Sequence, residues 1–314
     1  MTAQLLLVGE CMLELRAESA DRLSHSAAGD TFNTAVYLKR LLPELPVRYV
    51  SALGDDQMSG IIRAHMGRHG VDDGLVCSLP GRTPGLYAIE TDAAGERKFS
   101  YWRAQSAARG MLDEAHLARL YAALPDCRWL FLTGITLAIL DDERRAALLA
   151  LATRVRELGG WVIVDDNHRP ALWKAEPARL WLDQALRICT HALLGFDDQA
   201  QLYGDADPQA MLARILRNKT SEVVIKAGSA GCLVGGHGIE PRAVAGRPVR
   251  AVDTTAAGDS FNAGYLAARL SGQPPPEAAA YGCGLAGIVV AHRGAIIPLE
   301  SMPAPPAERV RREP

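Results

Sequence analysis

The sequence has no cluster of cysteines and no marked excess of charge of either sign. Its six cysteines are scattered singly, without the CxxC or Cys/His spacing of a zinc site and without a dense disulfide framework. A formal net charge of −2 gives no indication of a nucleic acid or an anionic membrane as a partner. Reduced thiols in a cytoplasmic protein fit this composition best.

Long apolar runs and two common nucleotide-binding motifs are missing as well. The N-terminal run QLLLVG is too short for a signal peptide or a membrane span, and it predicts a buried strand. No GxxxxGK[ST] occurs and no strand is followed by GxGxxG, which argues against a P-loop protein and a dinucleotide-dependent oxidoreductase. A chain of 314 residues suits one large α/β domain, so we expect residues 1–314 to form a single domain.

Short apolar runs alternate with helical patterns along most of the chain. This alternation predicts a mainly parallel central sheet flanked by helices on both faces. Residues 74–103 differ, because the runs within them read as strands without a helix between them, and 84–103 reads as a β-hairpin with a turn at 93–97. Residues 11–16 read as a half-exposed strand that joins them. They predict a separate, small antiparallel sheet. A further strand is expected near 247–252.

Polar residues gather where the predicted parallel strands end. They are Gly9-Glu10, Gly54-Asp55-Asp56, 165–169, 226–228 and 253–259. In an open parallel sheet ligands bind at the carboxyl ends of the strands, so these residues predict a common cleft.

The stretch DTTAAGDSFNAG, at 253–264, combines two acids, two threonines and three small residues in front of a helical pattern. A helix that begins near Ala257 directs its first, unpaired N–H groups at the strand ends and forms an anion site there. The alternative is structural, because an acid in the first turn commonly caps a helix and small residues allow tight packing.

This stretch resembles DTxGAGD, the C-terminal signature of the PfkB, or ribokinase-like, family of carbohydrate kinases. AAGDTFNTAVYLKRL, at 27–41, is similar to the sugar-binding motif of that family, and the resemblance extends along nearly the whole chain. It implies a ribokinase-like α/β fold and the ATP-dependent phosphorylation of a sugar. The small antiparallel sheet matches the family's β lid, here about 11–30 and 74–105, and a homodimer through the lid would cover its exposed face.

The resemblance also assigns roles near the phosphates. Asp259 is the expected base, which takes the proton of the substrate hydroxyl as that oxygen attacks the γ-phosphate of ATP. The N–H groups of Ala256, Ala257 and Gly258 would form the anion hole. Because Ala256 stands where the family usually has Gly, we expect its backbone not to need a positive φ.

Further residues are expected beside the nucleotide. Those residues are Asn167, Lys226, Gly228 and Gly231, although KAGSAG at 226–231 also reads as a plain turn between two strands. Mg²⁺ is implied by ATP, and its ligands stay unassigned. The NxxE motif of the family corresponds to GFDD here, with Gly195 and Asp198 in place of Asn and Glu.

Four stretches resemble the members of the family that phosphorylate 2-keto-3-deoxygluconate on its C6 hydroxyl to give 2-keto-3-deoxy-6-phosphogluconate: GLY at 85–87, 101–109, 165–170 and 291–298. Arg103 and Arg169 support a sugar acid, because a buried carboxylate needs charged partners. The residues expected to bind hydroxyl and keto groups are Gly29, Asp30, Asn33, Tyr87 and Tyr101, with Asp30 also a candidate N-cap. The alternatives are another sugar, such as fructose, ribose or a different deoxy-keto acid, and a non-catalytic sugar- or nucleotide-binding sensor.

Overall fold

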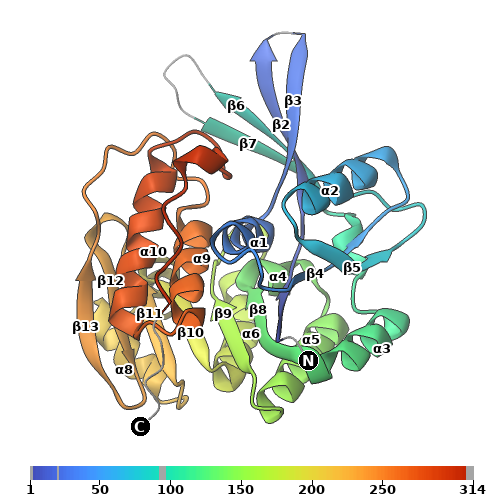
Figure 1. Ribbon diagram of the computed structural model, residues 1–314. Helices are drawn as coiled ribbons and strands as arrows, with labels where there is room; N and C mark the ends of the chain where they lie inside the picture. Colours follow the sequence, from blue (N-terminus) through green and yellow to red (C-terminus); the bar gives the residue numbers. More distant parts are fainter. Residues whose placement is uncertain (1–2, 20, 92–96, 309–314) are drawn as a thin grey trace.

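A computed structural model describes residues 3–19, 21–91 and 97–308, and a nine-stranded sheet runs through its body (Figure 1). The strand order is β13-β12-β11-β10-β9-β8-β1-β4-β5. The seven strands from β11 to β5 are parallel to their neighbours, and β12 and β13 add an antiparallel edge. The strands are β1 (Gln4–Val8), β4 (Val47–Leu53), β5 (Asp72–Ser78), β8 (Cys127–Thr133), β9 (Trp161–Asp165), β10 (His191–Gly195), β11 (Glu222–Lys226), β12 (Gly231–Gly236) and β13 (Ile239–Ala245). The expected mainly parallel sheet is confirmed.

Helices cover both faces of this sheet and create two hydrophobic cores. β1 shows the division, because Leu5 and Leu7 belong to one core while Leu6 and Val8 belong to the other, all fully buried. One core lies under α1 (Asp30–Leu41), α2 (Gln57–Arg68), α9 (Ala257–Leu270) and α10 (Pro275–Val290). The other lies under α3 (Glu114–Ala123), α4 (Gly134–Ile139), α5 (Asp142–Glu157), α6 (Ala175–Ile188), α7 (Phe196–Tyr203) and α8 (Pro208–Leu216).

A second, four-stranded sheet projects from the body (Figure 1) and is called the lid sheet below. Its order is β3 (Arg22–Ala28), β2 (Met12–Ser19), β6 (Leu86–Thr91) and β7 (Arg97–Trp102). The pairs β2–β3 and β6–β7 are antiparallel, while β2 and β6 run parallel. Successive side chains alternate between the two faces, so Met12 and Tyr87 face the body while Leu23 and Trp102 face outward.

Three sequence expectations about these elements need correction. The lid range starting at 74 is too wide, because β5 pairs with β4 in the main sheet. The strand expected near 247–252 is absent, and β13 lies at Ile239–Ala245 instead. β3 has no counterpart among the predicted strands, and the turn at 93–97 falls almost wholly outside the described residues.

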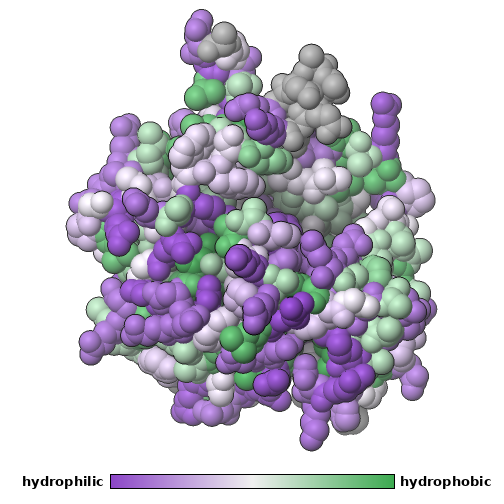
Figure 2. Space-filling view, turned by 180° about the vertical axis from the view of Figure 1, so that it is seen from behind, coloured by the Kyte–Doolittle hydropathy of each residue, from purple (hydrophilic) through white to green (hydrophobic). Residues whose placement is uncertain are grey.

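The surface is mixed in character. Figure 2 shows the back of the molecule, where hydrophilic and hydrophobic residues are interspersed over the body and the lid rises above it. Within the described ranges, no helix combines the length and the hydrophobicity needed to cross a membrane.

A buried polar network fixes α9, the helix that follows the DTTAAG stretch. Glu222, at the start of β11, accepts a hydrogen bond of 2.5 Å from the Tyr265 hydroxyl. It also forms an ion pair of 2.9 Å with Arg269. Burying a carboxylate is costly unless charge and hydrogen bonds compensate it, and both α9 residues do so here. The network therefore ties the body of α9 to β11 and sets the position of its first turn.

Candidate active site

A cleft with a volume of ≈ 870 Å³ lies between the lid sheet and the carboxyl ends of the main strands. β1 and β8 are neighbours whose following strands lie on opposite sides, and such a switch point is where ligands bind in open α/β sheets. The structure brings nearly all the expected site residues to this cleft. Those that line it are Gly29, Asp30, Asn33, Tyr87, Tyr101, Arg103, Asn167, Arg169, Lys226, Gly228, Ala256, Ala257, Gly258 and Asp259.

Gly231 stands apart from this set. Its φ is +100°, and an added Cβ would lie 2.1 Å from the carbonyl oxygen of Val244. The glycine is therefore required by the close pairing of β12 with β13. Gly228, with φ of +56° and open space around it, is the glycine of this turn that lines the cleft.

The first turns of α1 and α9 meet at the base of the cleft. Asn33 Nδ2 donates to Asp259 Oδ2 at 2.8 Å, and Thr34 Oγ1 donates to the carbonyl oxygen of Asp259 at 3.2 Å. Gly29 lets the start of α1 lie against the segment between β1 and β2, because an added Cβ would lie 2.3 Å from the carbonyl oxygen of Glu10. Asn33 was expected to bind substrate hydroxyls. Its amide nitrogen orients the carboxylate of Asp259, while its Oδ1 has no partner among the described residues.

The carboxyl group of Asp259 is strongly perturbed. Burial raises its pKa to about 8, and the negative charge of Asp30 adds to the effect, while the hydrogen bond from Asn33 opposes it. A carboxylate with a pKa near neutrality is suited to accept a proton from a hydroxyl group.

Asp30 makes a hydrogen-bonding triangle with two strand ends. Its Oδ2 accepts from Thr133 Oγ1 at 2.6 Å and from Asn167 Nδ2 at 3.0 Å. Burial raises the pKa of Asp30, and its hydrogen bond from Thr133 opposes the rise. Asp30 is not the N-cap of its helix, since Gly29 occupies that position without a side-chain bond.

The backbone before α9 differs from the expectation in two ways. Ala256 has φ of 61° and ψ of 17°, so a left-handed conformation is required after all and a non-glycine residue adopts it. The N–H group of Ala257 donates to the carbonyl oxygen of Thr254 at 3.2 Å. Within the described chain, the N–H groups of Ala256 and Gly258 have no acceptor, and they remain available to an anion.

Lys226 supplies the positive charge beside the first turn of α9. Its Nζ lies 3.0 Å from Asp165 Oδ1 and 3.2 Å from Asn262 Oδ1. Asn262 Nδ2 in turn donates to Asp165 Oδ2 at 2.6 Å. Asp165, at the end of β9, and Asn262, on α9, thus hold the ammonium group close to Gly258, where an added Cβ would lie 3.7 Å from Nζ.

The charged and aromatic residues expected to bind the sugar have different surroundings. Arg103 pairs with the buried carboxylate of Glu10, so its charge is already compensated. Arg169 keeps a half-exposed side chain and lies 3.8 Å from Asp198. The Tyr87 hydroxyl donates to Glu14, and the Tyr101 ring lies beside the Tyr87 ring in the cleft wall.

Acidic residues at the ends of β9 and β10 offer a place for a divalent cation. Gly195 N–H donates to Asp166 Oδ1 at 2.9 Å, while the buried Asp166 Oδ2 has no partner among the described residues. Burial and the charges of Asp165 and Asp198 raise the pKa of Asp166 well above its ordinary value. No group of three or more His, Cys, Asp or Glu in the described ranges can hold a metal alone. The arrangement fits Mg²⁺, which takes few protein ligands and keeps several waters.

Sequence reasoning did not assign roles to several residues that organise this site. They are Glu10, Glu14, Thr133, Asp165 and Asn262. Glu10 and Asp165 had a visible signal, since each is an acid next to the end of a buried strand. Thr133 and Asn262 are ordinary helix-start and helix residues in sequence, and only the packing of α1 and α9 gives them partners.

Comparisons with known proteins agree with this geometry. Residues 2–302 match the pfkB family of carbohydrate kinases. The 2-dehydro-3-deoxygluconokinase of Dickeya dadantii is 43% identical over 309 residues, covering 96% of this chain and 99% of the relative. The enzyme of the same name from Escherichia coli K12 is 41% identical over 310 residues, covering 97% and 100%.

A solved structure shows the same fold. The PfkB protein of Polaromonas sp. JS666 superposes with a TM-score of 0.83 at 27% identity, covering 96% of this chain and 99% of that one. The fold is thus ribokinase-like, with a lid sheet over a mostly parallel sheet. The chain belongs to the pfkB family of carbohydrate kinases, and it is a sugar kinase.

Proposed function

We propose that the protein transfers the γ-phosphoryl group of ATP to the C6 hydroxyl of 2-keto-3-deoxygluconate, giving 2-keto-3-deoxy-6-phosphogluconate. The observation that carries the proposal is a carboxyl group with a pKa of about 8, on Asp259, at the start of a helix with free N–H groups. The names of two relatives that are 41% and 43% identical support the substrate.

In this proposal Asp259 accepts the proton of the C6 hydroxyl as its oxygen attacks the γ-phosphorus. Asn33 fixes the carboxylate through the 2.8 Å hydrogen bond, which leaves the second carboxylate oxygen for the substrate. The N–H groups of Ala256 and Gly258, with the dipole of α9, stabilise negative charge on the transferred phosphoryl group. Lys226 adds positive charge nearby.

Arg169 is the residue best placed to recognise a sugar acid. Its guanidinium lines the cleft, is half-exposed and lies at the long distance of 3.8 Å from Asp198. Arg103 is already paired with Glu10 and therefore serves to hold the lid strand β7 against the end of β1. Gly228 and Asn167 border the part of the cleft proposed for the nucleotide.

Asp166 and Asp198 would hold Mg²⁺, directly or through water. When bound, the ion supplies positive charge that neutralises the phosphates of ATP. The raised pKa of Asp166 reflects burial and like charge, and a cation would relieve both unfavourable effects.

We also propose a homodimer through the outer face of the lid sheet. Leu23 and Trp102 lie on this face with exposed fractions of 60% and 61%, and an exposed apolar sheet face favours association.

A substrate panel tests the proposed function. With Mg-ATP, ADP release should be strong with 2-keto-3-deoxygluconate and weak with fructose or ribose at equal concentration. Arg169→Gln should raise KM for the sugar acid about tenfold or more, since a charged hydrogen bond is lost. Arg217→Gln, an exposed arginine on the far end of α8, is the control and should change nothing. Turnover with a neutral sugar alone would contradict the substrate assignment and leave the kinase chemistry standing.

The assignment of Asp259 predicts a definite pH dependence. The deprotonated carboxylate is the active form, so kcat/KM should rise with pH to a plateau with a midpoint near 8, and fall tenfold per unit below it. Asp259→Asn should lower kcat about 10²- to 10⁴-fold while sugar binding persists. Steady-state kinetics and calorimetric titration measure the two effects, and near-full activity of the Asn variant would refute the assignment.

The left-handed backbone conformation at residue 256 predicts how substitutions there change the stability of the protein. Ala256→Gly relieves a strain of about 1 kcal/mol but loses a methyl packed against the small apolar cluster that includes Met12 and Tyr87, so the free energy of unfolding should change by less than about 1 kcal/mol. Ala256→Val places a β-branched residue at positive φ and should cost about 2 kcal/mol. Urea denaturation measures both, with Ala213→Val on exposed α8 as the control for helix propensity, expected to cost about 0.5 kcal/mol. Equal costs for the two Val variants would contradict the strain argument.

The dimer is tested by mass in solution. Light scattering should give twice the 33.7 kDa of one chain, and Trp102→Glu should shift the population to monomer. Leu180→Glu, on α6, removes a similarly exposed apolar side chain away from the lid and should leave the mass unchanged. A monomer for the unmodified protein would eliminate the proposal.

A further inference from the structure

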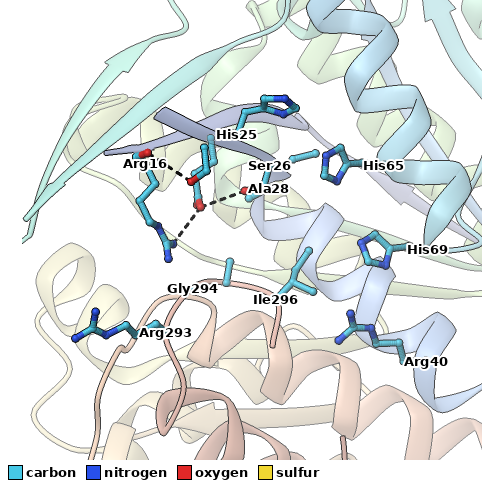
Figure 3. Close-up of a pocket in the computed structure, with 14 residues that line it drawn as sticks. Arg16, His25, Ser26, Ala28, Arg40, His65, His69, Arg293, Gly294 and Ile296 are labelled. Carbon is cyan, nitrogen blue, oxygen red and sulfur yellow. Dashed lines mark hydrogen bonds and ion pairs between the residues drawn. The ribbon is translucent and has the colours of Figure 1, made fainter. Parts of the chain in front are cut away.

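A second cavity of ≈ 360 Å³ lies at the base of the lid sheet (Figure 3). It is bounded by β2, β3, α1, α2 and the segment 293–296. No residue that lines it also lines the catalytic cleft. A small apolar cluster that includes Met12, Ala28, Tyr87 and Ala295 stands between the two. The cavity is therefore a separate compartment.

The wall of this cavity is rich in hydrogen-bond donors and cationic groups. Three arginines, Arg16, Arg40 and Arg293, line it together with one carboxylate, Glu14. That carboxylate is already engaged by Arg16 at 3.1 Å, by Ser26 at 3.2 Å and by Tyr87. In Figure 3 Arg40 reaches from α1 toward the cavity, while Arg293 lies at its rim. The surplus of charge in this wall is positive.

Three histidines complete the wall. The rings of His65 and His69 project from α2 toward the cavity, one turn apart (Figure 3), and His25 comes from β3. Their ring nitrogens make no hydrogen bond within the described part of the chain. The ring centroids of His25 and His65 lie 6.5 Å apart, and those of His69 and Phe32 lie 6.3 Å apart. Such unused polar groups around a cavity are suited to a ligand that accepts hydrogen bonds.

The electrostatics favour an anion over a metal ion. Burial lowers the pKa of His65 to about 4, and the positive charge of Arg68 adds to the effect. Burial also lowers the pKa of His69, with Arg40 as the next cause. An anion would reverse these charge effects, whereas a cation would be repelled by the guanidinium groups. The histidines do not form a metal-holding group in the described residues.

We propose that this cavity binds a small phosphate-bearing anion, either free phosphate or the phosphate group of a sugar phosphate. Guanidinium groups match phosphate oxygens with paired hydrogen bonds, and the serine hydroxyls and imidazoles supply further donors. The volume suits a ligand of this size.

The occupied site would act on the catalytic cleft through Glu14. This carboxylate joins Arg16, in the wall of the second cavity, to Tyr87, in the wall of the cleft. A phosphate that draws Arg16 away removes the positive partner of Glu14 and strengthens its hold on the Tyr87 hydroxyl. KM for the sugar should therefore respond to phosphate more than kcat does.

The test is a phosphate titration followed by the imidazole NMR signals of the full chain. A non-hydrolysable ATP analogue with Mg²⁺ occupies the catalytic cleft, so that phosphate cannot bind there. The signals of His65 and His69 should shift saturably at millimolar phosphate, and their pKa values should rise by about one unit or more. Sodium chloride at equal ionic strength should produce neither change. A parallel titration with 6-phosphogluconate gives a second dissociation constant. The ligand with the lower dissociation constant shows whether the cavity prefers a sugar phosphate or free phosphate.

Two variants separate a site from general charge attraction. Arg40→Gln and Arg16→Gln should each weaken phosphate binding about tenfold, because each removes a charged hydrogen bond. Arg68→Gln removes an equal charge from α2 without lining the cavity and should retain the binding. Unchanged His65 and His69 signals in the unmodified protein would overturn the proposal. Equal losses in all three variants would also overturn it.

Discussion

Repulsion between carboxylates is the constraint on which the arrangement of the cleft depends. Burial is the largest cause of the raised pKa of Asp259, the charges of Asp30 and Asp165 raise it further, and the cation Lys226 opposes them. The three carboxylates lie close together because the fold places the N-termini of two helices and the ends of several strands at one point. Because the cleft is short of positive charge before ligands arrive, the binding of a cation and of ATP with its metal is favoured there, and Asp259 is held close to the protonation balance that a base requires.

The same constraint explains why so many neutral donors surround these acids. Asn33, Asn167 and Thr133 each give a hydrogen bond to Asp259 or Asp30, and these bonds lower the pKa that burial raises. A cationic side chain in their place would lower the pKa of Asp259 further and make it a weaker base. Two arginines of the cleft lie beside other acids, Arg103 beside Glu10 and Arg169 beside Asp198. The arginine charges available for binding ligands are thus kept apart from Asp259, the carboxylate proposed to react.

The sequence predicted the features that are written locally and missed those that arise from contacts between distant segments. Strand-helix alternation and the polar strand ends were enough for the main sheet and for the cleft, because both follow from short-range periodicity. β3, RLSHSAA, has no alternating apolar pattern and becomes a strand only by pairing with β2. The left-handed backbone of Ala256 was not predicted, because alanine gives no local signal for it. The partners of Tyr87 and Asn33 lie 73 and 226 residues away, beyond any pattern in the chain.

The lid sheet is a shared wall, and this limits how it can move. Met12, Glu14 and Tyr87 lie on one face of it, yet Met12 and Tyr87 line the cleft while Glu14 lines the second cavity. β2 continues from β1 after three residues, so the base of the lid is anchored to an interior strand of the main sheet. Ala256 packs against the cluster between the cavities, so the turn that would hold the phosphoryl group touches the lid directly. A displacement of β2 therefore changes the substrate wall, the second cavity and the support of the anion-binding turn together, because interdigitated side chains cannot shift independently.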